Sequence, residues 1–337
     1  MRSLLVTGGA GFIGSNFVRM VLSSYPDTMV VNLDKLTYAG NLENLEGFIG
    51  HKNHVFVRGD ICNGRLIQKL IAEHDIDTII NFAAESHVDR SINEPKVFIE
   101  TNVTGTLTLL EAARDNQVER FIQISTDEVY GALGATGKFS EQTPLSPNSP
   151  YSASKAGADY MVEAFGHTWG LNYNITRCSN NYGPYQFPEK MIPLMINNAL
   201  DDRELPVYGD GLYVRDWLYV DDHCTAVWAV LENGKSGQVY NIGGCNEKTN
   251  LEVIGLILER LGKDKSLIRH VKDRPGHDRR YAIDASKIMS ELGWRPSVTF
   301  ADGINKTIKW YLNNHKWLNN VSSGEYRKYY ESMYSNR

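Results

Sequence analysis

Residues 6–14 read VTGGAGFIG, with glycines at positions 8, 9, 11 and 14. This stretch ends the apolar run Ser3–Thr7 and opens a helical pattern that extends from Phe12 to about Ser23. Glycine lets the backbone turn tightly and approach a pyrophosphate without a Cβ atom in the way. The helix N-terminus then offers N–H groups and the positive end of its dipole to the phosphates. We therefore predict a dinucleotide site at this strand–turn–helix junction.

Strand-like and helical patterns alternate through the first half of the chain. Further strands are expected at Met29–Leu33, His54–Arg58, Thr78–Phe82 and Arg120–Ser125, and helices at about Arg65–Glu73 and Val103–Asn116. This order predicts an α/β fold with a Rossmann-type, doubly wound parallel sheet that helices cover on both faces. Ligands of such sheets bind beyond the carboxyl ends of the strands, so we expect the chemistry there.

The pattern changes beyond Tyr182, where short strands are mixed with helices. Strands are expected at Leu205–Tyr208, Val214–Val220 and Val239–Ile242, and helices at about Asp222–Leu231 and Leu251–Leu261. This texture predicts a smaller C-terminal α/β substrate lobe. We place the nucleotide-binding domain at residues 1–183 and the second domain at residues 184–337, with the option that the chain crosses back into the first.

Two acidic residues follow the second and third expected strands. Asp34 lies 20 residues after Gly14, where a carboxylate binds the ribose hydroxyls of a dinucleotide and repels a 2′-phosphate. NAD is therefore favoured over NADP as the cofactor. Asp60 closes the third strand and suits a contact to the adenine edge.

A Tyr–Lys pair opens a later helix. Residues 150–155 read PYSASK, with Ser149 as the expected N-cap and Pro150 at the first helical position. Tyr151 and Lys155 are four residues apart and share one face of the helix. A nearby ammonium lowers the pKa of a phenol, so Tyr151 is expected to take a hydroxyl proton while a hydride leaves for the nicotinamide.

Three polar residues follow the fifth expected strand. Ser125–Gly131 reads STDEVYG, which places Thr126, Asp127 and Glu128 at the same edge of the sheet. Oxidation of an alcohol requires a tyrosine and a hydroxyl, but elimination of water also requires a base for the carbon proton and an acid for the leaving hydroxyl. Adjacent carboxyl groups in different environments are able to divide these two roles.

Composition limits the classes of partner. The formal net charge of the 337 residues is −5, which argues against a nucleic-acid binder. Apolar runs do not reach the roughly 18 residues that cross a bilayer, and a targeting signal is not evident. The four cysteines are widely spaced and form no CxxC pair, and no metal-binding cluster is visible. We expect a cytoplasmic protein with reduced thiols and no metal site, membrane or nucleic-acid partner.

The motifs together resemble those of extended short-chain dehydrogenase/reductases and, within that group, of the dTDP-glucose 4,6-dehydratase family. The resemblance spans nearly the whole chain and includes the glycine stretch, ESHVDRSI at residues 85–92, STDEVYG, PYSASK and DRPGHDRRY at residues 273–281. Its most specific part is the Thr126–Asp127–Glu128 triplet. Related epimerases usually lack both acids, whereas GDP-mannose dehydratases and sugar-acid decarboxylases usually carry only the Glu.

The resemblance implies conversion of dTDP-glucose to dTDP-4-keto-6-deoxyglucose and water, as in deoxysugar biosynthesis such as that of dTDP-rhamnose. The cycle consists of C4 oxidation by tightly bound NAD, elimination across C5 and C6, and hydride return to C6. By the same resemblance, Tyr151 is the base at the C4 hydroxyl, Glu128 removes the C5 proton and Asp127 protonates the leaving hydroxyl. Thr126 binds the C4 oxygen, and Lys155 holds the nicotinamide ribose and tunes Tyr151.

Two sets of binding residues follow from the resemblance. The set implied for NAD consists of Gly8, Gly11, Phe12, Ile13, Gly14, Asp34, Lys35, Leu36, Thr37, Asp60, Ile61, Ala83, Ala84, Thr101, Tyr151, Lys155 and Asn181. The set implied for the sugar nucleotide consists of His87, Thr126, Asp127, Glu128, Asn180, Glu189, Lys190, Arg215, Asn250, Arg274 and His277. An arginine fork suits a diphosphate because it binds phosphate oxygens in pairs. A homodimer through the helices Val103–Asn116 and Ser152–Thr168 is also implied.

Two other functions remain open from the residues alone. A UDP-glucose 4-epimerase of the same fold also begins with C4 oxidation, but has no step that uses the Asp127–Glu128 pair. A binding module that senses NAD redox state would tolerate loss of Tyr151, Lys155 or Glu128, yet all three are present. The base thymine differs from uracil by one methyl group, a contact of only about 1–3 kcal/mol, so the sequence does not fix the base.

Overall fold

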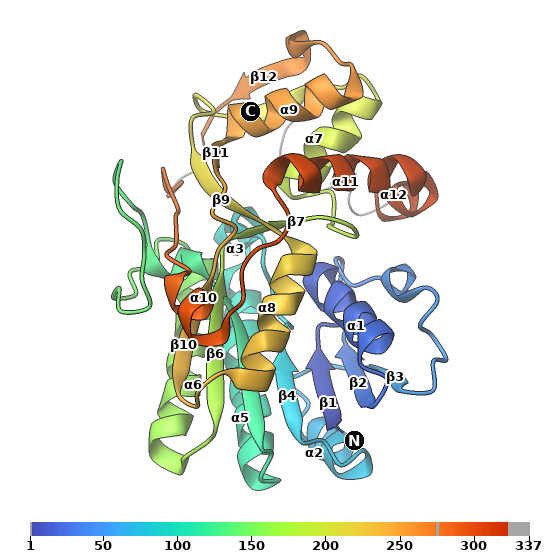
Figure 1. The fold of residues 1–337 in the computed structure, drawn as a ribbon, viewed down its shortest axis with the longest axis vertical. Coiled ribbons are helices and arrows are strands. Elements are labelled where there is room, and N and C mark those ends of the chain that lie inside the picture. The colour runs from blue at the N-terminus through green and yellow to red at the C-terminus, as the bar shows by residue number, and fades with distance from the viewer. Residues whose placement is uncertain (1, 274–275, 323–337) are drawn as a thin grey trace.

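Seven strands form the large sheet of the computed structural model, which describes residues 2–273 and 276–322. In chain order they are β1 (Arg2–Thr7), β2 (Thr28–Asp34), β3 (His54–Arg58), β4 (Thr78–Asn81), β5 (Arg120–Thr126), β6 (Tyr173–Cys178) and β10 (Gln238–Ile242). All neighbouring pairs are parallel, in the spatial order β10-β6-β5-β4-β1-β2-β3 (Figure 1). The order reverses between β1 and β4, which places a ligand crevice there. This sheet confirms the predicted fold class.

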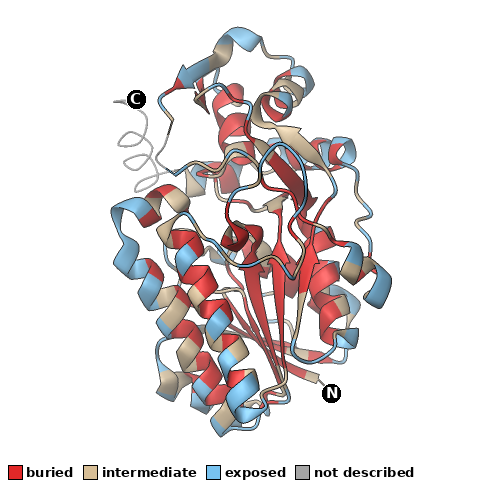
Figure 2. Ribbon diagram, turned by 90° about the vertical axis from the view of Figure 1, so that its left-hand side faces the viewer, coloured by how far each residue is buried: buried red, intermediate tan, exposed pale blue. Residues whose placement is uncertain are grey.

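Side chains of the sheet enter two separate cores. Leu4 and Val6 of β1 belong to one buried cluster, and Leu5 between them belongs to another, because side chains of a strand alternate between its faces. The helices on the first face are α1 (Phe12–Ser24), α8 (Val220–Asn233) and α10 (Ser286–Leu292). The helices on the second face are α2 (Gly64–Glu73), α5 (Thr106–Asp115) and α6 (Pro150–Trp169). Figure 2 shows the strands buried between helices whose outer faces are exposed.

A smaller lobe lies beyond the carboxyl ends of the large sheet and has its own hydrophobic core (Figure 1). Its strands are β7 (Asn180–Tyr182), β8 (Leu205–Tyr208), β9 (Val214–Tyr219), β11 (Glu247–Thr249) and β12 (Ile268–Val271). Its helices are α7 (Met191–Leu200), α9 (Asn250–Leu261), η4 (Lys265–Leu267), α11 (Phe300–Asn313) and α12 (His315–Val321). The strands form the sheets β11-β9-β7 and β12-β8.

The chain returns to the large sheet after its first passage through the smaller lobe. The strand Val239–Ile242, expected in that lobe, is part of β10 and pairs in parallel with β6. The helix expected at Asp222–Leu231 is part of α8, which packs on the large sheet. This difference arises because an apolar pattern specifies that a segment is buried but not which sheet buries it. The single boundary near residue 183 stays a prediction.

Five short helical elements lie in the segments that follow strands β2, β4 and β5 of the large sheet. They are η1 (Leu42–Leu45), α3 (Val88–Asn93), α4 (Pro95–Phe98), the π-helix η2 (Ile99–Gly105) and the 3-10 helix η3 (Asp127–Tyr130). The helix expected at Val103–Asn116 is thus the end of η2 followed by α5. Within residues 2–273 and 276–322, no helix combines the length and the apolar character that a bilayer span requires.

Candidate active site

A cavity opens at the carboxyl ends of β1, β2, β4 and β5, where the strand order reverses. Most of the residues expected to bind NAD line it. These are Gly8, Gly11, Phe12, Ile13, Gly14, Asp34, Lys35, Thr37, Asp60, Ile61, Ala83, Ala84, Thr101, Tyr151, Lys155 and Asn181. Leu36 is not among the lining residues that the structure describes; its side chain packs against the core that contains α1.

The glycine turn needs its glycines for space as well as for conformation. Gly8 has a φ of +71°, and a Cβ atom there would lie 2.6 Å from the Ala83 nitrogen. A Cβ atom at Gly14 would lie 2.2 Å from the Gly8 carbonyl oxygen. At the start of α1, Gly11 is the N-cap without a capping side chain, and the first turn contains no acid. The N–H groups of this turn thus suit phosphate oxygens.

Asp34 is fixed at the end of β2 by the backbone of the glycine turn. One carboxylate oxygen accepts the Ala10 N–H at 2.9 Å, and the other accepts the Leu36 N–H at 2.8 Å. Burial raises the pKa of Asp34 against these hydrogen bonds, which lower it. Asp60 forms an ion pair with Lys35 at 2.7 Å on the same rim of the cavity. The acids at residues 34 and 60 therefore lie together, as the strand ends predict.

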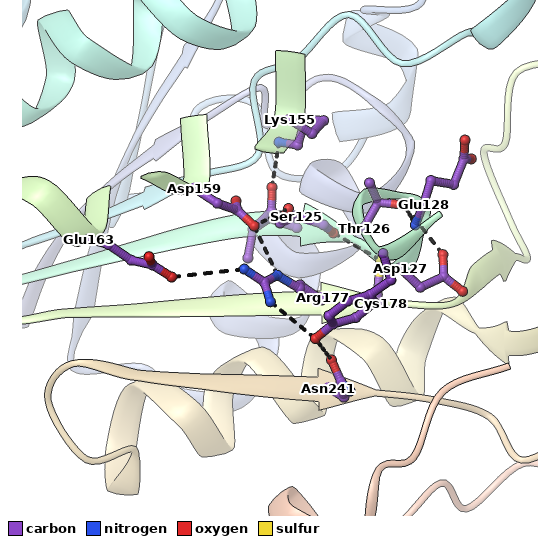
Figure 3. Close-up of polar contacts among 12 residues, drawn as sticks. Ser125, Thr126, Asp127, Glu128, Lys155, Asp159, Glu163, Arg177, Cys178 and Asn241 are labelled. Carbon is purple, nitrogen blue, oxygen red and sulfur yellow. Dashed lines mark hydrogen bonds and ion pairs between the residues drawn. The ribbon is translucent and has the colours of Figure 1, made fainter. Parts of the chain in front are cut away.

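The Tyr–Lys helix begins as its sequence predicts. Ser149 and Ser152 form a reciprocal capping box at the start of α6, with Pro150 in the first turn. Tyr151 and Lys155 are both buried and both line the cavity. The Lys155 ammonium donates a hydrogen bond of 2.7 Å to the Ile124 carbonyl oxygen (Figure 3). The helix thus places both side chains against the end of β5.

The pKa of Tyr151 differs in direction from the expectation. Burial and then the Glu128 carboxylate raise it well above the ordinary value, and a hydrogen bond with Thr126 lowers it only in part. The expected effect of Lys155 does not outweigh this burial, which also lowers the pKa of the ammonium itself. The four-residue spacing on the helix predicted that Lys155 lies near Tyr151. It gave no information on the burial of the phenol, which disfavours its ionised form. Positive charge placed near Tyr151 would lower this pKa.

Asp127 and Glu128 occupy different environments. Asp127 is 2% exposed, and burial followed by the charges of Glu128 and Asp216 raises its pKa well above the ordinary value. Burial of this kind favours the neutral, protonated form of a carboxyl group. Glu128 is half-buried and lines the cavity. The Thr126 hydroxyl accepts the Glu128 N–H and donates weakly to Asp127, at 3.3 and 3.4 Å.

A second cavity lies between the large sheet and the smaller lobe. Most residues expected to bind the sugar nucleotide line it, namely His87, Glu128, Asn180, Glu189, Lys190, Arg215, Asn250 and His277. Four residues, Glu128, Asn180, Glu189 and Lys190, line both cavities. Thr126 lines the first cavity alone, and Asp127 lies beneath the described lining of both. Arg274 lies outside the described residues.

Arg215 and His277 of the second cavity are held by neighbours. Arg215 donates hydrogen bonds to the Val214 and Asp278 carbonyl oxygens and lies 4.4 Å from the centre of the Tyr281 ring. The His277 ring stacks on Tyr213 with a centroid distance of 3.8 Å. These contacts orient both side chains at the wall of the cavity.

Some residues that line the cavities, or that contact a lining residue, were missed in the sequence. Tyr38 donates to one oxygen of Glu189 at 2.9 Å, and Arg90 donates to the other at 3.0 Å while its guanidinium covers the Tyr38 ring. Tyr208 and Trp217 line the second cavity. Tyr208 ends β8, so its place at a strand end was a usable signal. Tyr38 and Arg90 contact Glu189 but are far from it in the sequence, so no local sequence pattern indicated that the three residues lie together.

Comparison with known proteins agrees with this geometry. The model of a family described as GDP-mannose 4,6 dehydratase matches residues 5–307. A dTDP-glucose 4,6-dehydratase of Xanthomonas campestris pv. campestris (strain B100) is 56% identical, over 97% of this chain and 98% of the relative. The dTDP-glucose 4,6-dehydratase 1 of Escherichia coli (strain K12) is 51% identical, over 99% of each chain. These matches place the protein in the class of nucleotide-sugar dehydratases.

Solved structures give the same result. A dTDP-glucose 4,6-dehydratase of Bacillus anthracis, in complex with NAD, has a TM-score of 0.90 and 53% identity, over 95% of this chain and 100% of that chain. A UDP-glucose 4-epimerase of Thermotoga maritima has a TM-score of 0.87 but only 31% identity, over 93% of this chain and 99% of that chain. The chain belongs to the dTDP-glucose 4,6-dehydratase family.

Proposed function

We propose that this enzyme converts dTDP-glucose to dTDP-4-keto-6-deoxyglucose and water with NAD as its retained cofactor. The observation that carries the proposal is the position of Glu128, which lines both cavities beside the buried Asp127, whose pKa burial raises. A carboxylate at the junction of two sites is placed to act on a sugar that reaches from one toward the other. The product belongs to deoxysugar biosynthesis, of which dTDP-rhamnose formation is one example.

NAD fits the first cavity. The uncapped first turn of α1 suits the pyrophosphate, and Asp34 at the end of β2 suits the ribose hydroxyls. Lys155 and Asn181 line the part of the cavity near Tyr151 and would hold the nicotinamide end. When bound there, NAD would supply a hydride acceptor and donor for the sugar, together with positive charge that favours the ionised form of Tyr151.

The proton transfers are assigned to three side chains. Tyr151 takes the C4 hydroxyl proton. Thr126, which is hydrogen-bonded to Tyr151, binds the C4 oxygen. The C4 ketone acidifies the C5 proton, which Glu128 removes, and C5 takes up a proton again when the hydride returns to C6. Asp127 gives its proton to the C6 hydroxyl as water leaves, because a carboxyl group with a raised pKa holds a proton that it is able to donate. The different environments of Asp127 and Glu128 support this division.

The second cavity is assigned to the sugar nucleotide. Its basic residues Arg215 and Lys190 suit the diphosphate, and His87, Asn180, Glu189, Asn250 and His277 supply further polar groups along the wall. Both cavities meet at Glu128, so the reacting glucose would lie near Tyr151 and the nucleotide would extend toward α9. Arg274 is assigned to the diphosphate on the resemblance alone.

Mass analysis of the product tests the proposed function. Purified protein is incubated with dTDP-glucose without added NAD. Loss of one water per sugar is the expected result, and it would also show that NAD stays bound through purification. Conversion to the galactose isomer without a change in mass would mean an epimerase and would refute the dehydratase assignment. Parallel incubations with UDP-glucose and CDP-glucose test the preference for thymidine.

We propose in addition that two copies of the chain form a homodimer through α5 and α6. The outer face of α6 carries Ala153, Tyr160 and Ala164, which are exposed and lie on one stripe of the helix, with the partly buried Gly157 between them. Tyr160 is 53% exposed, and Ile99 of the neighbouring η2 is 49% exposed. Small and aromatic residues without charge on such a stripe suit packing between helices.

Replacement of Tyr160 by Arg is expected to convert the dimer to a monomer. The change places a charge at the centre of the proposed interface, which would have to be desolvated on association. Sedimentation velocity of the two proteins at equal concentration measures the change. The matched control is Lys69→Arg, an exposed residue on α2. A wild-type protein that sediments as a monomer would refute the interface.

The compartment is proposed to be the cytoplasm. All four cysteines are described and all are free thiols, with Cys178 and Cys224 buried. Reduced cysteines are typical of cytosolic proteins. Electrophoresis of the protein from intact cells after thiol alkylation tests this, because four modified cysteines are expected.

A further inference from the structure

A buried ion pair lies behind the catalytic edge of the large sheet. Asp159 of α6 is fully buried, and Arg177 of β6 is 3% exposed. The Arg177 Nε donates to Asp159 Oδ2 at 2.9 Å. Neither residue lines either of the two cavities within the described part of the chain. Burial of a charged pair gives little net stability by itself, so its position calls for another explanation.

The pair holds the residue before the Thr126–Asp127–Glu128 triplet. Ser125 Oγ donates a hydrogen bond of 3.0 Å to the same Asp159 oxygen that accepts from Arg177 (Figure 3). Asp159 lies four residues after Lys155, which lies four after Tyr151, so the three share one face of α6. The hydrogen bond therefore ties the end of β5 to the helix that carries the Tyr–Lys pair.

The pair also holds a residue after the triplet. The Arg177 NH1 group donates to the Tyr130 hydroxyl at 3.1 Å, and that hydroxyl donates to Asn241 Oδ1 at 2.8 Å. The Tyr130 ring stacks on Phe139 and lies 5.0 Å from the Arg177 guanidinium carbon. Tyr130 ends η3, which begins at Asp127. The last residue of η3 is thus fixed to β6 and β10.

We infer that Asp159 and Arg177 are positioning residues that fix residues 126–129 by holding Ser125 on one side of them and Tyr130 on the other. Because Asp159 lies on α6, these contacts also fix the position of Asp127 and Glu128 relative to Tyr151 on the same helix. The inference rests on the proposed function, because it assigns the reacting groups to these two elements. Its chemical importance is that a misplacement of about 1 Å is able to cost about 10²-fold in rate.

The charge of Asp159 supports the same assignment. Burial lowers the pKa of Lys155, and the Asp159 carboxylate opposes this effect. The carboxylate thereby favours the charged form of Lys155 as well as holding Ser125. Asp159 therefore acts on the proposed active site in two ways, through its hydrogen bond with Ser125 and through the effect of its charge on Lys155.

The double variant Ser125→Ala with Tyr130→Phe tests the inference. It removes the two hydroxyl groups through which the pair holds the segment but leaves the ion pair and the Tyr130 ring contacts in place. We expect kcat per NAD-loaded chain to fall by about 10- to 100-fold, with KM within twofold of the wild type. The bound NAD per chain should be unchanged. A purely structural role would instead lower the melting temperature or the NAD content, with kcat per loaded chain unchanged.

Two further variants make the test specific. Ser125→Thr keeps a hydroxyl at this position and is expected to retain kcat within threefold. The matched control is Ser3→Ala with Tyr240→Phe, which removes a buried serine and a buried tyrosine hydroxyl, each hydrogen-bonded, at positions outside both cavities. The inference is overturned if kcat of the Ser125/Tyr130 variant stays within twofold of this control. Failure of the wild type to dehydrate dTDP-glucose would overturn the proposed function and this inference with it.

Discussion

Replacement of Tyr151 by Phe is expected to lower kcat for dehydration of dTDP-glucose by about 10²–10⁴-fold, the usual contribution of a general acid–base group. The change removes the hydroxyl that takes the C4 proton but keeps the ring, whose edge contact with Phe98 has a centroid distance of 6.3 Å. The loss should occur at the first step, so that substrate binds without being oxidised. Mixing with substrate should then produce no reduced nicotinamide absorbance.

Tyr182→Phe is the matched control for this prediction. Tyr182 is fully buried in the core of the smaller lobe, and its hydroxyl has no hydrogen-bond partner among the described residues. The same atom is therefore removed from the same type of residue outside the proposed chemistry, and kcat should stay within a few-fold of the wild type. A Tyr151→Phe enzyme that still oxidises C4 at the wild-type rate would place the base elsewhere.

Replacement of Glu128 by Gln is expected to separate oxidation from elimination. C4 oxidation should persist, because Tyr151 and Thr126 remain. Removal of the C5 proton should fall by about 10²–10⁴-fold, because an amide is not a base. The enzyme should therefore accumulate reduced nicotinamide on addition of dTDP-glucose and incorporate little solvent deuterium at C5.

Both signals are measured in one experiment in D₂O, with absorbance followed during the reaction and the recovered sugar examined by NMR. Glu259→Gln is the control, since Glu259 is exposed on α9 and lies outside both cavities. Normal dehydration by the Glu128→Gln enzyme would refute the role of Glu128 as the base. Loss of both absorbance and exchange would mean instead that Glu128 is needed for binding or oxidation.

The sequence predicted those parts of the molecule that depend on local patterns. The strand at His54–Arg58 has the expected bounds because turn residues flank a short apolar run. The start of α6 at Pro150 also agrees, because a serine N-cap and a proline act within one turn. The two cavities bring together most of the residues that the resemblance implies, including Asp34 and Glu128.

Features that depend on packing could not be predicted in this way. The strand Val239–Ile242 was expected in the smaller lobe, with the option that the chain crosses back into the first domain; it pairs with β6 of the large sheet, a partner that its apolar residues alone do not specify. The pKa of Tyr151 was expected to fall, whereas enclosure of the phenol raises it. The contacts of Asp159 with Ser125 and Arg177 join three elements, and the spacing on α6 alone did not reveal them. Burial and long-range pairing, not local propensity, decide all three.

The most direct test of the account is a crossover experiment with dTDP-glucose that carries deuterium at C4. Substrate that carries deuterium at C4 and ¹³C at every glucose carbon is mixed with an equal amount of unlabelled substrate and incubated with the wild-type enzyme, and the product is analysed by mass and by NMR. We expect a product lighter by one water, with the deuterium at C6 of the same molecules that carried it at C4. Deuterium retained at C4 without loss of water, or exchanged between molecules or with solvent, would contradict internal transfer at a single site.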